Sequence, residues 1–142
     1  MQALQLSNFG ASNLSLVANA LPEPQEHEVV VRLEAASLNP RDSQIIAGQF
    51  TTAVDFPLVP LSDGAGTVTA VGAAVSRFSV GDSVTTLFFP NWHSGEATAG
   101  ERAISTGLEV PGAAREIGIF HEDSLARSAP HLSAAEASCY PC

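Results

Sequence analysis

The sequence predicts a mainly β domain with short helices, folded as a partly open barrel. Three observations support this fold: short segments in which apolar and polar residues alternate, glycine and proline between those segments, and few stretches with a helical period. Alternation with a period of two is typical of half-buried strands. A chain of 142 residues is the size of one domain and can bury a genuine core.

The first two strands are expected on either side of a turn at residues 8–10. Leu4 and Leu6 precede the turn and Leu14 and Leu16 follow it, with one polar residue inside each pair. This pattern predicts a hairpin with one apolar face.

The strongest strand is expected over residues 27–38, after a loop at 22–24. The loop reads Pro-Glu-Pro, and proline cannot donate to a sheet ladder. The two faces of the strand should carry alternate residues: Val29, Val31 and Leu33 on one, and Val30, Arg32 and Glu34 on the other.

A short helix is expected over residues 39–48. Pro40 suits the first helical position, and Gly48 suits the position just past the helix end. Residues 50–60 contain two further prolines and are predicted to form a loop.

Three more strands are expected over residues 66–72, 82–89 and 116–120. Residues 91–111 are rich in Gly, Ser, Thr and Ala and are predicted to be irregular. Ser133-Ala134-Ala135-Glu136 is a capping box, so a helix should begin there. We therefore expect one domain over residues 1–132, with residues 133–142 starting a helix that leads into a further domain.

Charge and composition exclude several classes of function. Fifteen acidic residues against six basic ones give a formal net charge of −9, which disfavours binding to nucleic acid or to an anionic membrane. No apolar segment approaches membrane-spanning length, and no signal peptide is evident. Two cysteines near the end of the chain cannot form a disulfide framework. A cytoplasmic protein is the expectation.

Three motifs carry a family resemblance: Leu-Asn-Pro-Arg-Asp at 38–42, Val-Pro-Leu-Ser-Asp-Gly-Ala-Gly-Thr-Val-Thr-Ala-Val-Gly at 59–72, and Phe-Ser-Val-Gly-Asp-Ser-Val at 78–84. Together they resemble the catalytic, GroES-like (alcohol dehydrogenase-like) domain of the medium-chain dehydrogenase/reductase superfamily, in its zinc-free quinone oxidoreductase branch. The resemblance implies a GroES-like barrel with the Rossmann domain absent, because the chain stops where the dinucleotide-binding domain should begin.

The resemblance also implies a reaction, the transfer of a hydride from NADPH (or NADH) to the β-carbon of an enone or quinone. The small-molecule carbonyl or quinone would bind in a cleft of this domain. The full-length parent would hold the nicotinamide cofactor, and none is expected to be bound by this chain, because hydride chemistry requires the cofactor domain.

Negative charge develops on the carbonyl oxygen in such a reaction, and hydrogen-bond donors must meet it when no metal does so. Asn39, Arg41 and Ser62 are candidate catalytic donors by residue type, and Asp42 and Asp63 are expected to orient them. The alternative is structural: Asn39 caps the short helix, Asp42 stabilises its first turn, and Arg41 is solvated.

The cofactor side of the cleft is expected at Asn39, Pro40 and Gln44, where the resemblance places the nicotinamide ring. An apolar slot for a flat substrate can be walled by aromatic residues. Phe50, Phe89 and Trp92 are the candidates for this substrate pocket, with Phe56 and Phe88 the other aromatic residues considered.

Zinc is not expected. Zinc-dependent relatives use a cysteine and a Gly-His-Glu motif at positions where this chain has Asn39 and Ser62-Asp63. A neutral amide and a hydroxyl cannot replace a thiolate and an imidazole as ligands. Cys142 matches the third ligand position, but one thiolate alone holds no zinc.

The glycines are interpreted as structural. Gly64 and Gly66 lack the third glycine of a dinucleotide fingerprint and precede a strand rather than a helix. Turns are expected at Gly64, Gly66, Gly72, Gly81 and Asp82, where glycine permits a positive φ or a close backbone approach.

Two functions therefore remain open. One is the substrate domain of a zinc-independent NAD(P)H-dependent oxidoreductase, inactive without its cofactor domain. The other is a stand-alone GroES-like module without catalysis that binds a partner or self-associates through the face left exposed by the missing domain.

Overall fold

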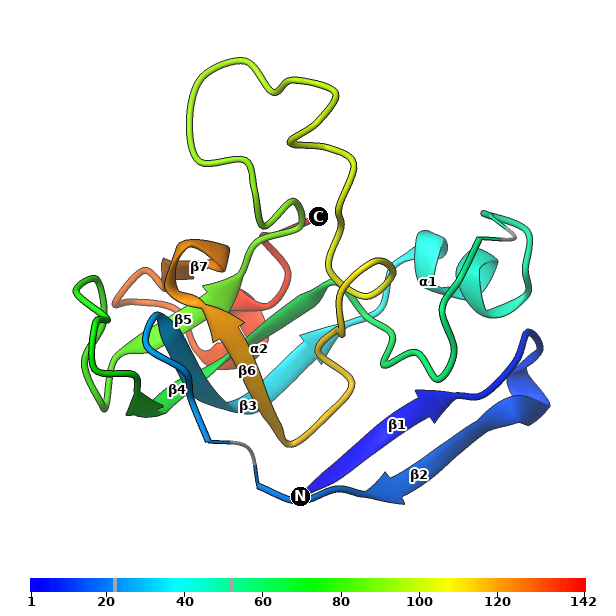
Figure 1. Ribbon diagram of the computed structural model, residues 1–142, viewed down its shortest axis with the longest axis horizontal. Coiled ribbons are helices and arrows are strands. Elements are labelled where there is room, and N and C mark those ends of the chain that lie inside the picture. The colour runs from blue at the N-terminus through cyan, green and yellow to red at the C-terminus, as the bar shows by residue number, and fades with distance from the viewer. Residues whose placement is uncertain (22, 52) are drawn as a thin grey trace.

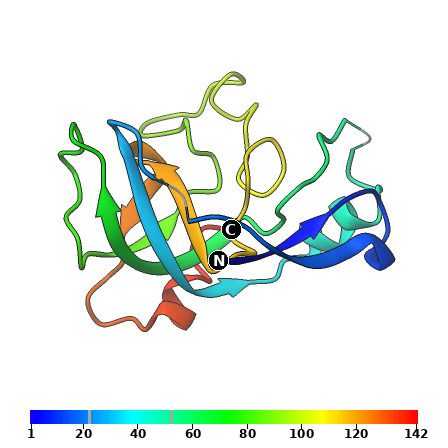
Figure 2. The same ribbon diagram turned by 60° about the horizontal axis from the view of Figure 1, so that its bottom comes forward.

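The five-stranded sheet curls into a half-barrel, beside which lies a separate two-stranded sheet (Figures 1 and 2). The computed structural model describes residues 1–21, 23–51 and 53–142. The larger sheet has the strand order β6-β3-β4-β5-β7, and the smaller one pairs β1 with β2. The strands are β1 (Gln2–Leu6), β2 (Leu14–Ala18), β3 (Glu28–Ser37), β4 (Asp63–Val71), β5 (Ser83–Thr86), β6 (Ile117–His121) and β7 (Leu125–Arg127).

Helices are few and short among the described residues: α1 (Pro40–Ile46), α2 (Ala134–Ala137) and two 3-10 turns, η1 (Ala11–Asn13) and η2 (Glu122–Ser124). This arrangement confirms the mainly β, GroES-like fold, and the described residues contain no Rossmann domain. Among the same residues, no helix combines the length and apolar character that a membrane crossing requires.

The two predicted strands are confirmed, but their leucines are not buried throughout, because Leu16 is 62% exposed. β1 and β2 pair antiparallel, with Leu4 opposite Leu16, and bridges at Ala3–Arg115 and Leu6–Leu58 join this small sheet to the rest of the domain. Leu6 and Leu58 belong to a core cluster under α1, which also contains Ile45 and Leu108. The hairpin is therefore held by a core of its own.

The long central strand β3 pairs antiparallel with β4 on one side and with β6 on the other. Val29 and Val31 are fully buried, as expected, but Val30 is also buried. Val30 is not part of the core cluster that contains Val29 and Val31, and the β3–β4 register shifts between Val30 and Val31. The main core lies against this strand: Val29, Val31, Val68, Phe78, Val84, Phe120 and Leu125.

β4 begins at Asp63, three residues earlier than predicted, so Gly64 and Gly66 lie inside the strand and not in a turn. Neither glycine has a positive φ. A Cβ on Gly66 would lie 2.0 Å from the carbonyl oxygen of Arg32 on β3. Gly66 therefore permits the close approach of β3 and β4, which is the other role proposed for these glycines.

The remaining turn residues lie where they were predicted. Gly72 directly follows β4, and Gly81 has a φ of 96°. The carboxylate of Asp82 accepts a hydrogen bond of 2.9 Å from the N–H of Ser79 and closes that turn.

Other boundaries were predicted less well. β5 ends at Thr86 rather than at residue 89, and the three-residue strand β7 was not predicted at all. Residues 91–111 contain only an isolated bridge, as expected for an irregular segment. Of the loops predicted at 22–24 and 50–60, residues 22 and 52 lie outside the described residues.

Candidate active site

The carboxylate of Asp63 is the centre of a buried polar cluster. Its Oδ2 accepts hydrogen bonds from Asn39 Nδ2 at 3.1 Å and from Ser37 Oγ at 3.2 Å, and its Oδ1 accepts one from the hydroxyl of Ser62. Asp63 and Ser62 are both 1% exposed. We call Ser37, Asn39, Ser62 and Asp63 the Asp63 cluster. It contains two of the predicted donors and the residue predicted to orient them.

Strand pairing explains why these residues meet. Ser37 ends β3 and lies opposite Asp63, the first residue of β4, in the antiparallel register. Thr86 of β5 fixes the same corner, because its hydroxyl accepts from the N–H of Gly64 at 2.9 Å and donates to the carbonyl of Ser62 at 2.8 Å.

The backbone just before the cluster is strained. Leu61 is the only described residue other than glycine with a positive φ, at 73°, a region that costs a side-chain-bearing residue about 1 kcal/mol or more. Gly107 and Gly112 pack against it, and a Cβ on Gly112 would lie 2.2 Å from the carbonyl oxygen of Leu61.

The start of α1 combines the structural and the functional interpretations. Asn39 precedes the helix, and its N–H donates to the carboxylate of Asp42 at 2.8 Å, which stabilises the first turn as proposed. Its side-chain amide donates to Asp63. Burial raises the pKa of Asp42, which is 2% exposed and whose Oδ1 has no hydrogen-bond partner among the described residues.

Arg41 is not the solvated residue of the structural alternative. Its guanidinium carbon lies 4.6 Å from the ring centre of Phe88 and 5.3 Å from that of Phe50. Its Nη1 donates to the carbonyl of Thr106 at 3.2 Å, and its Nη2 donates to the hydroxyl of Ser105. Burial lowers the pKa of Arg41, while the charges of Asp42, Glu109, Cys142 and Asp63 raise it.

An apolar pocket of about 430 Å³ adjoins this region. We call it the aromatic pocket; its lining residues are Leu87, Phe88, Phe89, Trp92, Tyr140, Pro141 and Cys142. The predicted Phe89 and Trp92 line it, whereas Phe50 does not and instead stacks on Arg41 with 50% of its surface exposed. Phe56 packs against Phe9 elsewhere in the domain.

Two residues expected on the cofactor side, Pro40 and Gln44, are exposed on α1. The carbonyl of Gln44 accepts from the N–H of Gln49 at 2.8 Å and so closes the helix end. The Asp63 cluster does not include either residue, so only Asn39 of the three lies within it.

The residues at the positions where zinc-dependent relatives carry ligands belong to the Asp63 cluster. Asn39 offers an amide N–H and Ser62 a hydroxyl, and each donates a hydrogen bond to the carboxylate of Asp63. Burial, and then the charge of Asp63, raise the pKa of Cys142, which disfavours the thiolate that zinc requires. Across residues 1–21, 23–51 and 53–142, no group of three His, Cys, Asp or Glu side chains is placed to hold a metal ion.

Sequence reasoning missed Ser37, Thr86, Ser105 and Thr106. Ser37 could have been found by pairing the strand before the 38–42 motif antiparallel with the 59–72 motif, because that register places Ser37 opposite Asp63. Nothing local marks Ser105 and Thr106, because they reach Arg41 from more than sixty residues away in an irregular segment.

Comparison with known proteins identifies the family of this domain. The alcohol dehydrogenase GroES-like domain family matches residues 25–131. A zinc-type alcohol dehydrogenase-like protein of Schizosaccharomyces pombe is 36% identical over 81% of this chain and 33% of its own length. A chloroplastic quinone-oxidoreductase homolog of Spinacia oleracea is 32% identical over 99% of this chain and 39% of its own length.

The fold is shared as well. The crystal structure of a putative alcohol dehydrogenase from Sinorhizobium meliloti superposes with a TM-score of 0.91 and 35% identity, covering 99% of this chain and 42% of the other. This chain thus spans between a third and two fifths of the length of these two curated relatives. The chain belongs to the GroES-like domain family of the medium-chain dehydrogenase/reductase superfamily, with relatives among its quinone oxidoreductases and alcohol dehydrogenase-like proteins.

Proposed function

We propose that this chain is the substrate domain of a zinc-independent, NAD(P)H-dependent oxidoreductase that reduces a quinone or an enone. The observation that carries the proposal is the Asp63 cluster, in which Asn39 and Ser62 stand at the zinc-ligand positions and both donate to one buried carboxylate. Within such an enzyme the nicotinamide would supply the hydride. This chain would supply the substrate pocket and the donors for the carbonyl oxygen.

Asn39 is the best placed donor. Its amide has two N–H groups, and the hydrogen bonds of the side chain use one of them, toward Asp63. The second remains to meet the carbonyl oxygen of the substrate, where negative charge develops. Asp63 would hold the amide in that orientation.

Ser62 and Arg41 take positioning roles in this proposal. The single hydrogen of the Ser62 hydroxyl is committed to Asp63, and the side chain is buried. The Arg41 guanidinium ties α1 to Ser105 and Thr106 and leans on Phe88, which lines the aromatic pocket. Removing either group would misplace the donor or the pocket wall rather than remove a reacting atom.

Trp92 gives a direct test, because it is the single tryptophan of the chain and lines the aromatic pocket. Titration with 1,4-naphthoquinone should quench its fluorescence in a saturable manner. Phe89→Ala should weaken binding by about tenfold, because it removes an aromatic wall. Phe50→Ala, outside the pocket lining, is the matched control and should bind normally. Quenching that does not saturate, or that the two variants affect equally, would refute the proposal.

Catalysis by the chain alone provides the second test. Mixing it with NADPH and naphthoquinone should leave NADPH unoxidised, because we assign the dinucleotide site to a separate domain. Turnover above the rate of a heat-denatured sample would show that the cofactor is bound by these 142 residues.

Self-association is favoured by a specific observation. Leu38, Phe50, Trp92 and Tyr140 are 80%, 50%, 42% and 72% exposed, and exposed apolar side chains promote association where they gather into one patch. We infer that they form the surface that a cofactor domain or a second copy would cover. Light scattering on the eluting chain should detect oligomers, and a strictly monomeric chain at high concentration would argue against this surface.

A further inference from the structure

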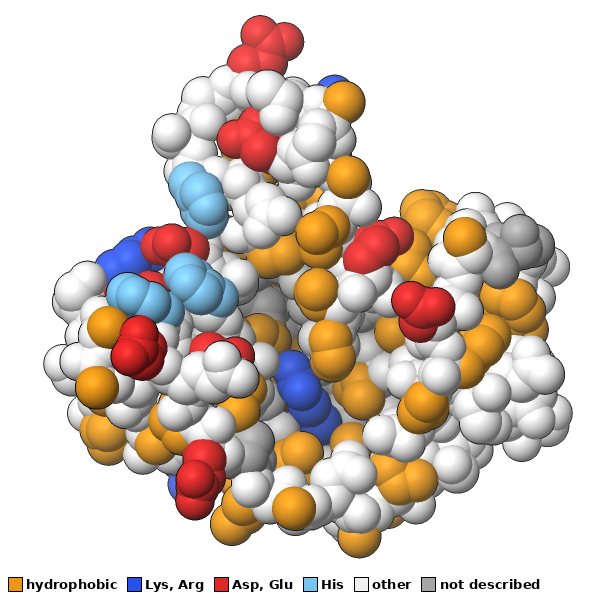
Figure 3. All heavy atoms as spheres, in the orientation of Figure 1, with side chains coloured by type: hydrophobic (Ala, Val, Ile, Leu, Met, Phe, Trp, Pro, Cys, Tyr) orange, Lys and Arg blue, Asp and Glu red, His pale blue; other side chains and the backbone are white. Residues whose placement is uncertain are grey.

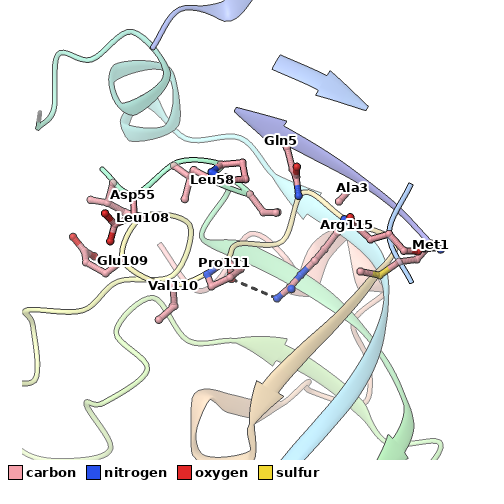
Figure 4. Close-up of a pocket in the computed structure, with 13 residues that line it drawn as sticks. Met1, Ala3, Gln5, Asp55, Leu58, Leu108, Glu109, Val110, Pro111 and Arg115 are labelled. Atoms are coloured by element: carbon pink, nitrogen blue, oxygen red, sulfur yellow. Dashed lines mark hydrogen bonds between the residues drawn. The ribbon is translucent and has the colours of Figure 1, made fainter. Parts of the chain in front are cut away.

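A second pocket, of about 460 Å³, lies between β1 and the segments 55–59 and 108–111. Figure 4 shows the side chain of Arg115 entering it from the side of β1, with Asp55 and Glu109 at the other end. Figure 3 shows a hollow between the two sheets with a basic side chain at its base and hydrophobic side chains around it. We call this the Arg115 pocket; it is separate from the aromatic pocket.

Arg115 is poorly satisfied by the protein. Its Nη2 donates to the carbonyls of Pro111 and Ile119 at 3.4 Å each, both long bonds. Its Nε is buried without a hydrogen-bond partner, and no carboxylate of the described residues forms an ion pair with it. Burial lowers its pKa to about 10, so the group remains charged at neutral pH.

The local sequence makes room for this guanidinium. Its central carbon lies 5.0 Å from the ring centre of Phe120. A Cβ on Gly118 would lie 2.5 Å from the Phe120 ring and 3.0 Å from Arg115 Nε. Glycine inside β6 therefore permits the stack of Arg115 on Phe120, although glycine weakens a strand. Among the described residues Nη1 makes no hydrogen bond, and a half-buried cation held this way is suited to receive an anion.

The other walls decide which anion fits. Leu58, Val59, Leu108 and Val110 line the pocket with apolar surface, and Asp55 and Glu109 carry negative charge at its far end. A doubly charged phosphate would be repelled by those carboxylates and would leave the apolar wall uncovered. A monoanion with an apolar body would meet less repulsion from the two carboxylates and would cover the apolar wall.

We propose that the Arg115 pocket binds a small organic monocarboxylate, with its carboxylate on the guanidinium of Arg115 and its apolar body against Leu58 and Val110. Arginine recognises carboxylates through paired N–H donors. This binding site does not depend on the reaction proposed for the Asp63 cluster.

Binding can be measured with benzoate and hexanoate as probes on the ¹⁵N-labelled chain. Millimolar benzoate should shift the amide resonances of Ala3, Leu58 and Val110, and leave those of Phe89 and Trp92 in place. Benzamide, the neutral analogue, and inorganic phosphate should bind at least about tenfold more weakly, because the charge-assisted bonds are lost or opposed. Equal binding of benzamide, or stronger binding of phosphate, would overturn the proposal.

Variants locate the site. Arg115→Met should abolish the benzoate shifts, whereas Arg32→Met, which removes an exposed arginine paired with Glu34, should leave them unchanged. Gly118→Ala should weaken binding by displacing Arg115 without removing its charge. If Arg115→Met fails to fold, the pattern of shifted resonances in the unmodified chain decides alone: shifts confined to the aromatic pocket, or none, would refute the proposal.

Discussion

Arg41 beside the aromatic pocket and Arg115 in its own pocket are both withdrawn from water, and their surroundings differ. Arg41 has two aromatic faces, two hydrogen bonds to the 105–106 segment and a nearby acidic group on several sides. Arg115 has one aromatic face, two long hydrogen bonds and no ion-pair partner among the described residues. Arg41 is therefore part of the folded framework, whereas the surroundings of Arg115 leave room for the carboxylate proposed above.

The largest effect on stability should come from the Asp63 cluster, whose hydrogen bonds are all made within the protein. Asp63→Ala leaves the donors of Asn39, Ser37 and Ser62 without their acceptor, which should lower the free energy of unfolding by about 3 kcal/mol. Urea denaturation measures the loss. Asp123→Ala, a half-exposed carboxylate in a surface ion pair, should cost under about 1 kcal/mol. Equal losses in the two variants would show that the Asp63 cluster is not the stabilising centre described.

Glu122 is a third charged group to compare with the two arginines, because its carboxylate has several hydrogen-bond partners. His27, together with the N–H groups of Ser76 and Arg77, holds the pKa of its carboxyl at about 2, below the ordinary 4.5. A carboxyl with a lowered pKa in the folded state stabilises the fold above pH 4.5, and this contribution is lost as the pH falls toward 2.

Glu122→Gln should therefore lower the free energy of unfolding at pH 7 by about 2 kcal/mol, and the deficit should shrink on acidification. Urea denaturation at pH 7, 5 and 3 gives the profile. Neither Arg41 nor Arg115 titrates in this window, so a deficit that is constant with pH would contradict the pairing of Glu122.

The last test compares the two arginines directly, and the smallest effect is expected at Arg115. Arg41→Met breaks the bonds to Thr106 and Ser105 and the contacts with Phe50 and Phe88, which should cost about 2 kcal/mol. Arg115→Met removes a partly desolvated charge without a counter-ion, and should leave stability unchanged or raise it by up to about 1 kcal/mol. Thermal and urea unfolding of both variants measure the contrast. A larger loss for Arg115→Met would reverse the comparison.

Much of the frame could be read from local patterns. The hairpin of β1 and β2, the core of β3, and the starts of α1 and α2 follow from alternation at Leu4 and Leu14 and from caps at Asn39 and Ser133. β7 was missed because three residues are too few to show a period. Gly66 was misplaced in a turn because a glycine needed for close strand packing cannot be told from a turn glycine without the partner strand.

The candidate site was predictable only in part, for the same reason. Asn39, Ser62 and Asp63 lie in motifs that carry a family resemblance, but their mutual hydrogen bonds depend on the pairing of β3 with β4. Nothing local distinguished Arg115 from a solvated arginine. Its burial depends on Phe120 and Gly118 and on the distant β1 strand.

The left-handed conformation of Leu61 has a consequence for the substrate selection proposed above. Gly107 and Gly112 pack against the backbone of this left-handed leucine, and we infer that this contact limits how far the Ser62 hydroxyl and the Asp63 carboxylate that follow it can adjust. A substrate should therefore need a shape that fits the preformed site, because the site can adapt little by induced fit. Flexible, branched carbonyl compounds should accordingly be poorer guests than rigid planar ones.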